Sequence, residues 1–158
     1  MKKFLLFLLL SAPLVLHAQN AQLINAKALI NRLNAKSNQI EVVNFWATWC
    51  GPCVAELPLF EKLRSEARPD VKVTLVSMDL DLNPDAGKVH RFVALKKIKS
   101  EVLILQEDDL SNWINDIDKE WSGALPATLV INHKTGKRKF FANPVREGDL
   151  DKLINEVK

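Results

Sequence analysis

Apolar positions follow two different spacings that alternate along the chain. Spacings of three and four residues, as on one face of a helix, predict helices over residues 21–36 and from Cys53 to about Ala67. Nearly continuous apolar runs, rich in β-branched residues, predict buried strands at 41–47 and 71–78. Pro58 lies inside the second helix and predicts a kink there, because proline has no N–H to donate.

The second half of the chain continues this alternation and ends with a hairpin and a helix. Asn83 and Pro84 have the residue types of an N-cap and a first helical position, so they predict the start of a third helix. The further predicted elements are a strand at 102–105, a helix that buries Leu110, Trp113, Ile117 and Trp121, a hairpin of strands 125–132 and 139–142, and a closing helix that buries Leu150, Leu153, Ile154 and Val157. This order predicts an α/β sandwich with a mixed central sheet.

The first residues have a different composition. Lys2 and Lys3 precede an apolar run of 13 residues, and the small Ala18 comes directly before a polar stretch. This pattern is typical of a secretory signal peptide, so we expect a signal at 1–18 and one domain at 19–158. A membrane span needs about 20 apolar residues, so an uncleaved anchor is the weaker alternative. The predicted location is therefore the periplasm, in soluble form after cleavage.

Composition and charge narrow the range of functions. The chain has 158 residues, of which 47% are hydrophobic and 26% charged, as in ordinary globular proteins rather than disordered or collagen-like ones. Residues 19–158 contain 20 basic and 19 acidic side chains. A nearly neutral domain gives no reason to expect nucleic acid or an anionic membrane as a partner. We expect a monomer.

The only two cysteines of the chain stand close together, in the sequence Cys50-Gly51-Pro52-Cys53. A disulfide across two intervening residues removes little entropy from the unfolded chain, so it is a poor structural staple and a good exchangeable bond. Gly51 is expected to allow a tight turn, and Pro52 suits the first turn of a helix. Cys50 would then lie at a helix N-terminus, where the helix dipole lowers the pKa of a thiol.

Other uses of the two cysteines have less support. A zinc site usually has four ligands, and residues 19–158 add only His90 and His133, neither of them near the cysteines in sequence. His90 is more simply a helix-surface residue and His133 a hairpin-turn residue. We therefore expect no metal and no cofactor, although a metal-handling or partner-docking module remains an alternative. Peroxide reduction needs a peroxidatic cysteine in a different sequence setting.

The sequence NFWATWCGPC at 44–53 closely resembles the active-site segment of the thioredoxin superfamily. Glu56 and Pro58 resemble the continuation of that segment in the TlpA/ResA-like secreted members, and residues 83–105 resemble their additional helix and strand. The resemblance implies a thioredoxin-like fold and thiol:disulfide oxidoreductase activity. TlpA-like proteins usually begin with a β-hairpin, whereas here a helix is predicted, as in plain thioredoxins.

The resemblance also implies roles for the residues of this segment. Cys50 would be the exposed nucleophile and Cys53 the buried resolving thiol, with a raised pKa and a need for a proton acceptor. Glu56 lies one turn after Cys53 on the same helix face and would accept that proton. Cytosolic thioredoxins carry an aspartate where Asn44 stands, which gives Glu56 more of this role. The alternative for Glu56 is a solvated surface charge.

A second set of residues is expected to bind the substrate. Pro126 interrupts a strand pattern, which predicts an edge, a bulge or a cis bond, and the resemblance implies a cis-proline that faces the cysteines. Leu125 would pair with the substrate backbone by β-augmentation. Trp49, Gly51 and Pro52 would complete the docking surface, while Trp46 fits core packing equally well.

These inferences together predict an exported thiol:disulfide oxidoreductase that reduces protein disulfides. Its partners would be a disulfide-containing client protein and a dithiol electron donor, either soluble or in the membrane, because an exported dithiol is otherwise driven to the disulfide. The Gly-Pro pair between the cysteines resembles reducing thioredoxins. A disulfide oxidase or isomerase remains an alternative, since the reduction potential also depends on thiolate stabilisation.

Overall fold

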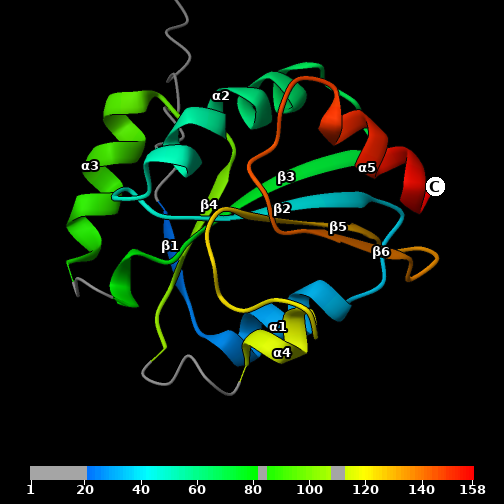
Figure 1. Ribbon diagram of the computed structural model, residues 1–158, viewed down its shortest axis with the longest axis horizontal. Coiled ribbons are helices and arrows are strands. Elements are labelled where there is room, and N and C mark those ends of the chain that lie inside the picture. The colour runs from blue at the N-terminus through cyan, green and yellow to red at the C-terminus, as the bar shows by residue number, and fades with distance from the viewer. Residues whose placement is uncertain (1–20, 82–84, 108–112) are drawn as a thin grey trace, which may run out of the picture.

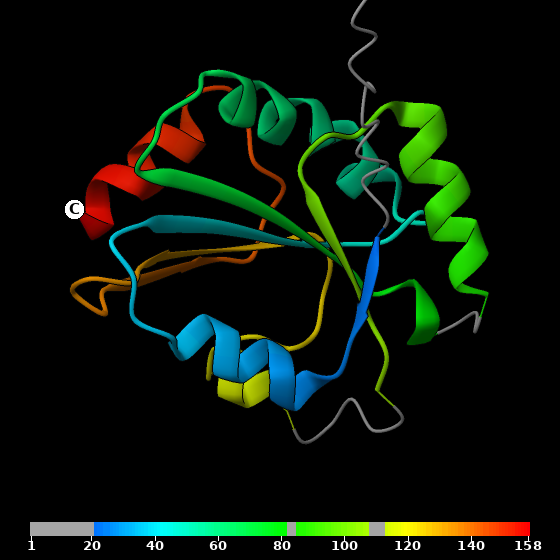
Figure 2. The same cartoon turned by 180° about the vertical axis from the view of Figure 1, so that it is seen from behind.

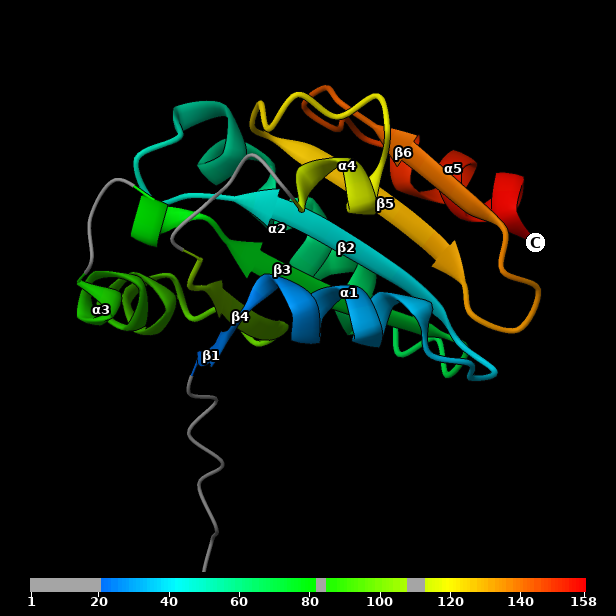
Figure 3. The same ribbon diagram turned by 90° about the horizontal axis from the view of Figure 1, so that it is seen from below.

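A twisted sheet of six strands forms the centre of the molecule in the computed structural model, which describes residues 21–81, 85–107 and 113–158 (Figure 1). The strands are β1 (Gln22–Ile24), β2 (Ile40–Trp46), β3 (Val71–Ser77), β4 (Glu101–Leu105), β5 (Ala127–Asn132) and β6 (Arg138–Phe141). Their order across the sheet is β1-β4-β3-β2-β5-β6 (Figure 3). Strands β1, β4, β3 and β2 are parallel to one another, whereas β5 is antiparallel to β2 and β6 is antiparallel to β5. The predicted mixed sheet is confirmed.

Helices cover both faces of this sheet (Figures 1 and 2). The helices are α1 (Ala26–Asn34), α2 (Gly51–Ser65), α3 (Ala86–Lys96), α4 (Ile114–Ile117) and α5 (Asp149–Val157), and a 3-10 turn, η1, spans Asp79–Asp81. Buried residues of α2, α3 and α5 form one core with one face of the sheet, and those of α1 and α4 form a second core with the other face. The architecture is therefore a three-layer α/β sandwich.

Strand β2 lies in the middle of the sheet and contributes to both cores. All seven of its residues are buried, and alternate side chains point to opposite faces, as in any strand. Val42 and Trp46 belong to the core under α2, whereas Val43 and Phe45 belong to the core over α1. The Phe45 ring lies 4.5 Å from that of Trp121, measured between centroids. The predicted strand 41–47 is therefore confirmed, and it ends where the two cysteines follow.

The predicted helix over residues 21–36 is wrong at its start. Residues 22–24 form β1, which pairs in parallel with β4, and α1 begins only after Asn25, whose side chain accepts a hydrogen bond from the Ala28 N–H at 2.8 Å. Leu23, an apolar residue within the predicted helix, is 57% exposed. Pairing with the edge of the sheet outweighs the helical spacing here, because three residues are too few for spacing to distinguish a strand from a helix.

Other sequence-based boundaries also change. The signal at 1–18, the cap pair Asn83 and Pro84, and Leu110 lie outside the described residues. Helix α3 is capped by Asp85, which accepts a hydrogen bond from the Gly87 N–H at 2.9 Å. The helix predicted around Trp113 and Trp121 shrinks to the four residues of α4.

The second of these tryptophans, Trp121, lies outside the short helix and forms its own hydrogen bonds. Both tryptophans are buried as predicted, but Trp121 lies in a turn, where its backbone N–H donates to Asp118 and its indole N–H donates to the Ala124 carbonyl at 2.9 Å. The indole N–H of Trp121 thus has a backbone acceptor outside the helix, and a longer helix is not needed to satisfy this buried group. The apolar spacing therefore identified the core residues correctly but overestimated the length of the helix.

A buried ionic cluster lies under α1, at the end of β2 remote from the cysteines. Glu41 on β2 is only 3% exposed. Its carboxylate is 3.0 Å from the Arg32 guanidinium, accepts the Thr74 hydroxyl at 2.6 Å and lies 2.9 Å from Nε2 of His133. The other ring nitrogen of His133 is 2.8 Å from the Ala35 carbonyl. His133 thus lies in the hairpin turn, as the sequence suggested, and it is also a buried partner of Glu41.

This cluster predicts a loss of stability in acid. Glu101 on β4 belongs to the same cluster, because it pairs with Arg32 and with Lys72. Hydrogen bonds from these two side chains hold the pKa of Glu101 at about 2. Burial raises the pKa of Glu41, but contacts with Thr74, Arg32 and His133 lower it overall. Because these carboxyls bind protons more weakly when folded, their contribution is present above the unfolded pKa and lost as the pH falls from about 4.5 towards 2. We expect Glu101→Gln to remove about 2 kcal/mol of that pH dependence in urea unfolding.

The exposed Glu120 provides a matched control for this prediction. Glu120→Gln removes the same charge from a site outside the cluster, so its unfolding free energy should fall with acid as steeply as that of the unmodified protein. If Glu101→Gln and Glu120→Gln gave parallel curves from pH 7 to pH 3, Glu101 would have no role in acid stability.

Candidate active site

The two cysteines lie in the turn that joins β2 to α2. Cys50 is the N-cap of α2, and its sulfur accepts a hydrogen bond from the Cys53 N–H at 3.3 Å. Pro52 occupies the first turn of the helix, where its missing N–H leaves no gap in the helical bonding. Cys50 and Cys53 form a disulfide whose Cα atoms are 5.3 Å apart. The sulfur pair therefore lies at the positive end of the helix dipole.

The two sulfurs differ in their access to solvent, though less than the sequence suggested. Cys53 is completely buried, and Cys50 exposes only 6% of its surface in the disulfide form, so the expectation of a well-exposed Cys50 is wrong. The neighbouring Trp49 is 48% exposed, and Gly51 and Pro52 are exposed as well. A partner that reaches Cys50 must therefore contact these three residues, because they form the rim around the sulfur.

The turn itself does not require glycine. A Cβ at Gly51 would meet no atom within 4 Å, and the residue does not adopt a left-handed φ. Gly51 lies in the turn as expected, but another residue with an ordinary helical backbone would also fit at the start of α2.

A buried aspartate outside the cysteine segment holds the turn in place. Asp79 is 1% exposed and accepts hydrogen bonds from the Thr48 N–H and the Ser77 hydroxyl, both at 2.9 Å, and from the Thr48 hydroxyl. The backbone adds a bond from the Met78 N–H to the Trp46 carbonyl at 2.8 Å. Sequence reasoning missed Asp79, although an acid directly after a buried strand was a visible signal. It ties the segment before Cys50 to the end of β3.

Glu56 is a buried side chain and not a solvated surface charge. It is 3% exposed, and its two carboxylate oxygens accept hydrogen bonds from Asn44 Nδ2 at 2.8 Å and from the Val145 N–H at 2.7 Å. Burial raises the pKa of Glu56, while these two hydrogen bonds lower it by a smaller amount. A carboxyl with a raised pKa, one helical turn after Cys53, binds a proton more readily than a solvated glutamate. Its role as proton acceptor stays a prediction.

Asn44 joins three elements through one amide group. Besides Glu56 on α2, its Nδ2 lies 3.3 Å from both the Ala127 carbonyl and the Thr128 hydroxyl at the start of β5. Its Oδ1 is buried and has no partner among the described residues. Because a rotated amide would present Oδ1 instead, Asn44 can donate to the ionised carboxylate or accept from the protonated one.

The Leu125–Pro126 peptide bond is cis, as the resemblance implied. Pro126 is buried directly before β5, and Ala127 lies opposite Phe45 near the end of β2. The proline therefore lies at the same end of the sheet as the cysteine turn. Leu125 is half-buried and packs against both cores. Trp46 is completely buried and belongs to the core.

The two histidines of the described residues lie away from the sulfurs. His90 is exposed on α3, and His133 is bound to Glu41 at the opposite end of β2. Within the described ranges, no three side chains among His, Cys, Asp and Glu gather as metal ligands would. None of the helices in these ranges is long and apolar enough to cross a membrane.

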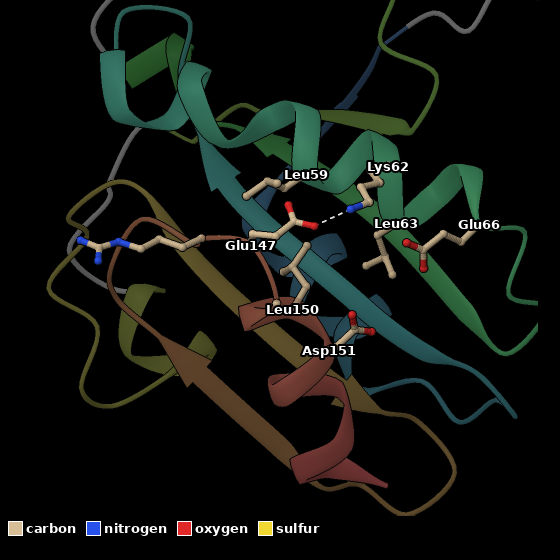
Figure 4. Close-up of a pocket in the computed structure, with 9 residues that line it drawn as sticks. Leu59, Lys62, Leu63, Glu66, Glu147, Leu150 and Asp151 are labelled. Atoms are coloured by element: carbon tan, nitrogen blue, oxygen red, sulfur yellow. Dashed lines mark hydrogen bonds and ion pairs between the residues drawn. The ribbon is translucent and has the colours of Figure 1, made fainter.

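A small cavity between α2 and the segment before α5 is too narrow for a substrate (Figure 4). Its volume is about 30 Å³, which accommodates about one water molecule. The Lys62 ammonium pairs with the Glu147 carboxylate across it, and Leu59, Leu63 and Leu150 supply apolar walls. The candidate chemistry of this protein therefore rests on the sulfur pair rather than on this cavity.

Comparisons with known proteins agree with this geometry. Residues 21–111 match the family model described as Thioredoxin. The chain is 37% identical over 59 residues to thioredoxin of Mycobacterium bovis, an alignment that covers 37% of this chain and about half (49%) of that protein.

Two solved structures show the same fold. A thioredoxin-related protein from Neisseria meningitidis serogroup B has a TM-score of 0.65 and 23% identity, over 77% of this chain and 86% of that one. A secreted Mycobacterium tuberculosis disulfide oxidoreductase, described as homologous to E. coli DsbE, has a TM-score of 0.54 and 22% identity, over 80% of this chain and 96% of that one. The described residues thus adopt the thioredoxin-like fold.

Proposed function

Because the chain belongs to the thioredoxin family, we propose that it is an exported thiol:disulfide oxidoreductase that reduces disulfides of client proteins. The observation that carries this proposal is the Cys50–Cys53 disulfide at the N-terminus of α2, with Cys50 the more accessible sulfur. A disulfide that closes so short a loop adds little stability, so two cysteines placed this close together serve exchange better than folding.

The reaction proceeds in two exchange steps. In the reduced protein, the N–H groups at the start of α2 favour the thiolate of Cys50, which attacks one sulfur of the client disulfide. A mixed disulfide forms and the first client thiolate leaves. The Cys53 thiolate then attacks the Cys50 sulfur, so that the Cys50–Cys53 disulfide forms and the second client thiolate leaves. Two electrons pass to the client, and a dithiol donor returns them to the protein.

Glu56 serves the second step in this proposal. Cys53 is completely buried, so its thiol must lose a proton inside the protein before it can attack. Glu56 is the buried carboxyl on the next turn of α2, and its raised pKa suits it to accept that proton and release it later. Asn44 and the Val145 N–H fix the position of the carboxylate.

The client docks at the rim around Cys50. Trp49, Gly51 and Pro52 offer an exposed surface, partly aromatic, next to the sulfur. The backbone of Leu125, just before the cis-proline Pro126, lies at the same end of the sheet, and there a client strand can add by β-augmentation.

Export and the reducing direction rest on separate support. The residues at 1–18 have the pattern of a secretory signal, and one structural neighbour is described as secreted. In an oxidising compartment the dithiol is maintained only by an electron donor, which we propose to be a dithiol protein in solution or in the membrane. The Gly-Pro pair between the cysteines resembles reducing members of the superfamily.

The proposal is tested by turnover. The purified protein, supplied with a small dithiol as donor, should accelerate the reduction of a protein disulfide at least about tenfold over the dithiol alone. The equilibrium potential of the Cys50–Cys53 pair should be low, near that of reducing thioredoxins. A high potential would identify an oxidase or isomerase instead, and stoichiometric metal uptake without turnover would identify a metal-handling module.

A further inference from the structure

A groove begins beside the cysteine turn and follows the outer face of α2. It has a volume of about 380 Å³ and lies between α2 and the residues that connect α3 to β4. Its apolar lining consists of Val54, Leu57, Pro58 and Ile98. Val54 directly follows Cys53, and its N–H donates to the Cys50 carbonyl at 3.0 Å. The groove is therefore adjacent to the proposed site of disulfide exchange.

Four basic side chains line this groove: Arg64, Lys96, Lys97 and Lys99. All four are exposed, and the three lysines form no ion pair within the part of the chain that the structure describes. Lys97 ends α3 in a left-handed conformation with φ of 53°. The chain turns at that residue, so that Lys96 and Lys99 lie along the same groove.

The one acid in the groove does not neutralise these lysines. Glu61 uses both carboxylate oxygens to accept the N–H groups of Lys99 and Ser100, each at 2.9 Å, and it lies 3.5 Å from Nε of Arg64. Its charge is thus directed at the backbone of the α3–β4 connection. The Lys96 ammonium lies 5.8 Å from the centre of the Phe92 ring, and no carboxylate within the described residues pairs with any of the three lysines. The groove therefore keeps an excess of positive charge.

The same region carries an excess of basic over acidic side chains that the rest of the chain does not have. Residues 85–99 carry five basic and one acidic side chain, whereas the rest of the chain carries 17 basic and 18 acidic ones. The overall balance near neutrality therefore conceals a basic surface over α3 and its C-terminal end. Leu95, 78% exposed, adds an apolar side chain to that surface. An apolar floor with a basic rim is complementary to a chain segment that carries carboxylates.

We propose that this groove binds an acidic segment of the client protein, close in sequence to the disulfide that Cys50 attacks. The proposal rests on the proposed function, and it defines the class of client that the site prefers. At 1.5 Å per residue, the groove residues Val54 to Arg64 lie about 6 to 21 Å along α2 from Cys50. An extended peptide covers this distance in about two to six residues, so the carboxylates should stand two to six positions from the client cysteine.

Synthetic peptides with one cystine test this directly. Three versions carry four Glu, four Gln or four Lys residues at positions two to five after the cystine, and the dithiol-driven kcat/KM is measured for each. We expect the Glu peptide to exceed the Gln peptide about tenfold at about 20 mM salt and the Lys peptide to be the poorest. The preference should shrink to about twofold at 0.5 M salt, because salt screens exposed charges.

Variants locate the effect in the groove. Lys97→Asn together with Lys99→Gln should reduce the preference for the Glu peptide to about twofold and leave the kcat/KM of the Gln peptide unchanged. Asn tolerates the left-handed conformation at position 97. The control removes two lysines from the tip of the β5–β6 hairpin, Lys134→Gln with Lys137→Gln, on the side of the molecule opposite α3 (Figures 1 and 2). It should keep the full preference.

The outcomes separate this inference from the proposed function. If none of the three peptides is reduced, the proposed function fails. If all three are reduced at equal rates, or if the groove variant keeps the full preference, the acidic-client proposal is wrong while the oxidoreductase remains. Equal rates together with lysine-dependent sedimentation on vesicles containing 30% anionic phospholipid would assign the groove to a membrane surface instead.

Discussion

Replacing Cys50 by serine should abolish disulfide reduction, with a loss in kcat/KM of at least about a thousandfold. A serine hydroxyl is not ionised near neutral pH, even at a helix N-terminus, so it cannot take the place of the thiolate that attacks the client. The substitution exchanges one atom in the N-cap of α2, and serine is itself a favourable N-cap, so the fold should be preserved. Initial rates of dithiol-driven reduction of a protein disulfide measure the loss.

Cys53→Ser is the matched variant for this prediction. It retains the nucleophile but removes the resolving thiol, so a mixed disulfide between Cys50 and the client should accumulate and be visible by mass spectrometry. Cys50→Ser should give no such adduct. Comparable turnover by Cys50→Ser and the unmodified protein would remove Cys50 from the mechanism and with it the assignment of the two roles.

Asn44→Asp should destabilise the protein by about 2 to 4 kcal/mol at pH 8. The substitution places a second carboxylate against that of Glu56, where the Asn44 amide now donates at 2.8 Å, in a site that is completely buried at position 44. Two buried carboxylates in contact cannot both ionise without a large penalty. At pH 5 the pair can share a proton, so the penalty should be smaller there. Urea unfolding at both pH values measures the difference.

Exchanging the two partners provides the control. Asn44→Asp combined with Glu56→Gln restores one carboxylate and one amide in the same contact, with their positions reversed. The double variant should recover most of the stability that Asn44→Asp loses at pH 8. Its turnover should be low, because the carboxyl is no longer on α2, one turn after Cys53. If the double variant were as unstable as Asn44→Asp alone, like-charge repulsion would not be the cause.

The strands and the main helices could be predicted from the sequence because their apolar spacing was long and consistent. Strand β2 and helix α5 are examples: the first is buried on both faces, and the second buries Leu150, Leu153, Ile154 and Val157. Prediction failed where pairing partners decided the structure. Strand β1 has only three residues and is held by β4, about 80 positions away in the chain, so local spacing contained no sign of it. The position of Trp121 outside a helix depended on a hydrogen-bond acceptor in the following turn.

The candidate site shows the same division. The cysteine pair, Glu56 and Pro126 could be identified from their spacing and from a family resemblance carried by adjacent residues. The contacts that position them come from remote segments. Asp79 is visible in the sequence as an acid directly after a buried strand, but its bond with the Thr48 N–H before Cys50 is not. The Val145 N–H reaches Glu56 across 89 positions of sequence. Contacts of backbone groups leave no mark in the side-chain pattern.

The hydrogen bond from the Val145 N–H to Glu56 makes this amide a spectroscopic probe of the protonation of Glu56. The amide hydrogen of Val145 points at the carboxylate and is one of its two hydrogen-bond donors, so its NMR chemical shift depends on whether that group carries a proton. A single resonance, followed through a titration of the oxidised and then of the reduced protein, would report how opening the disulfide alters the affinity of Glu56 for its proton. The spectrum would thereby give the coupling between proton and electron without any substitution near the sulfurs.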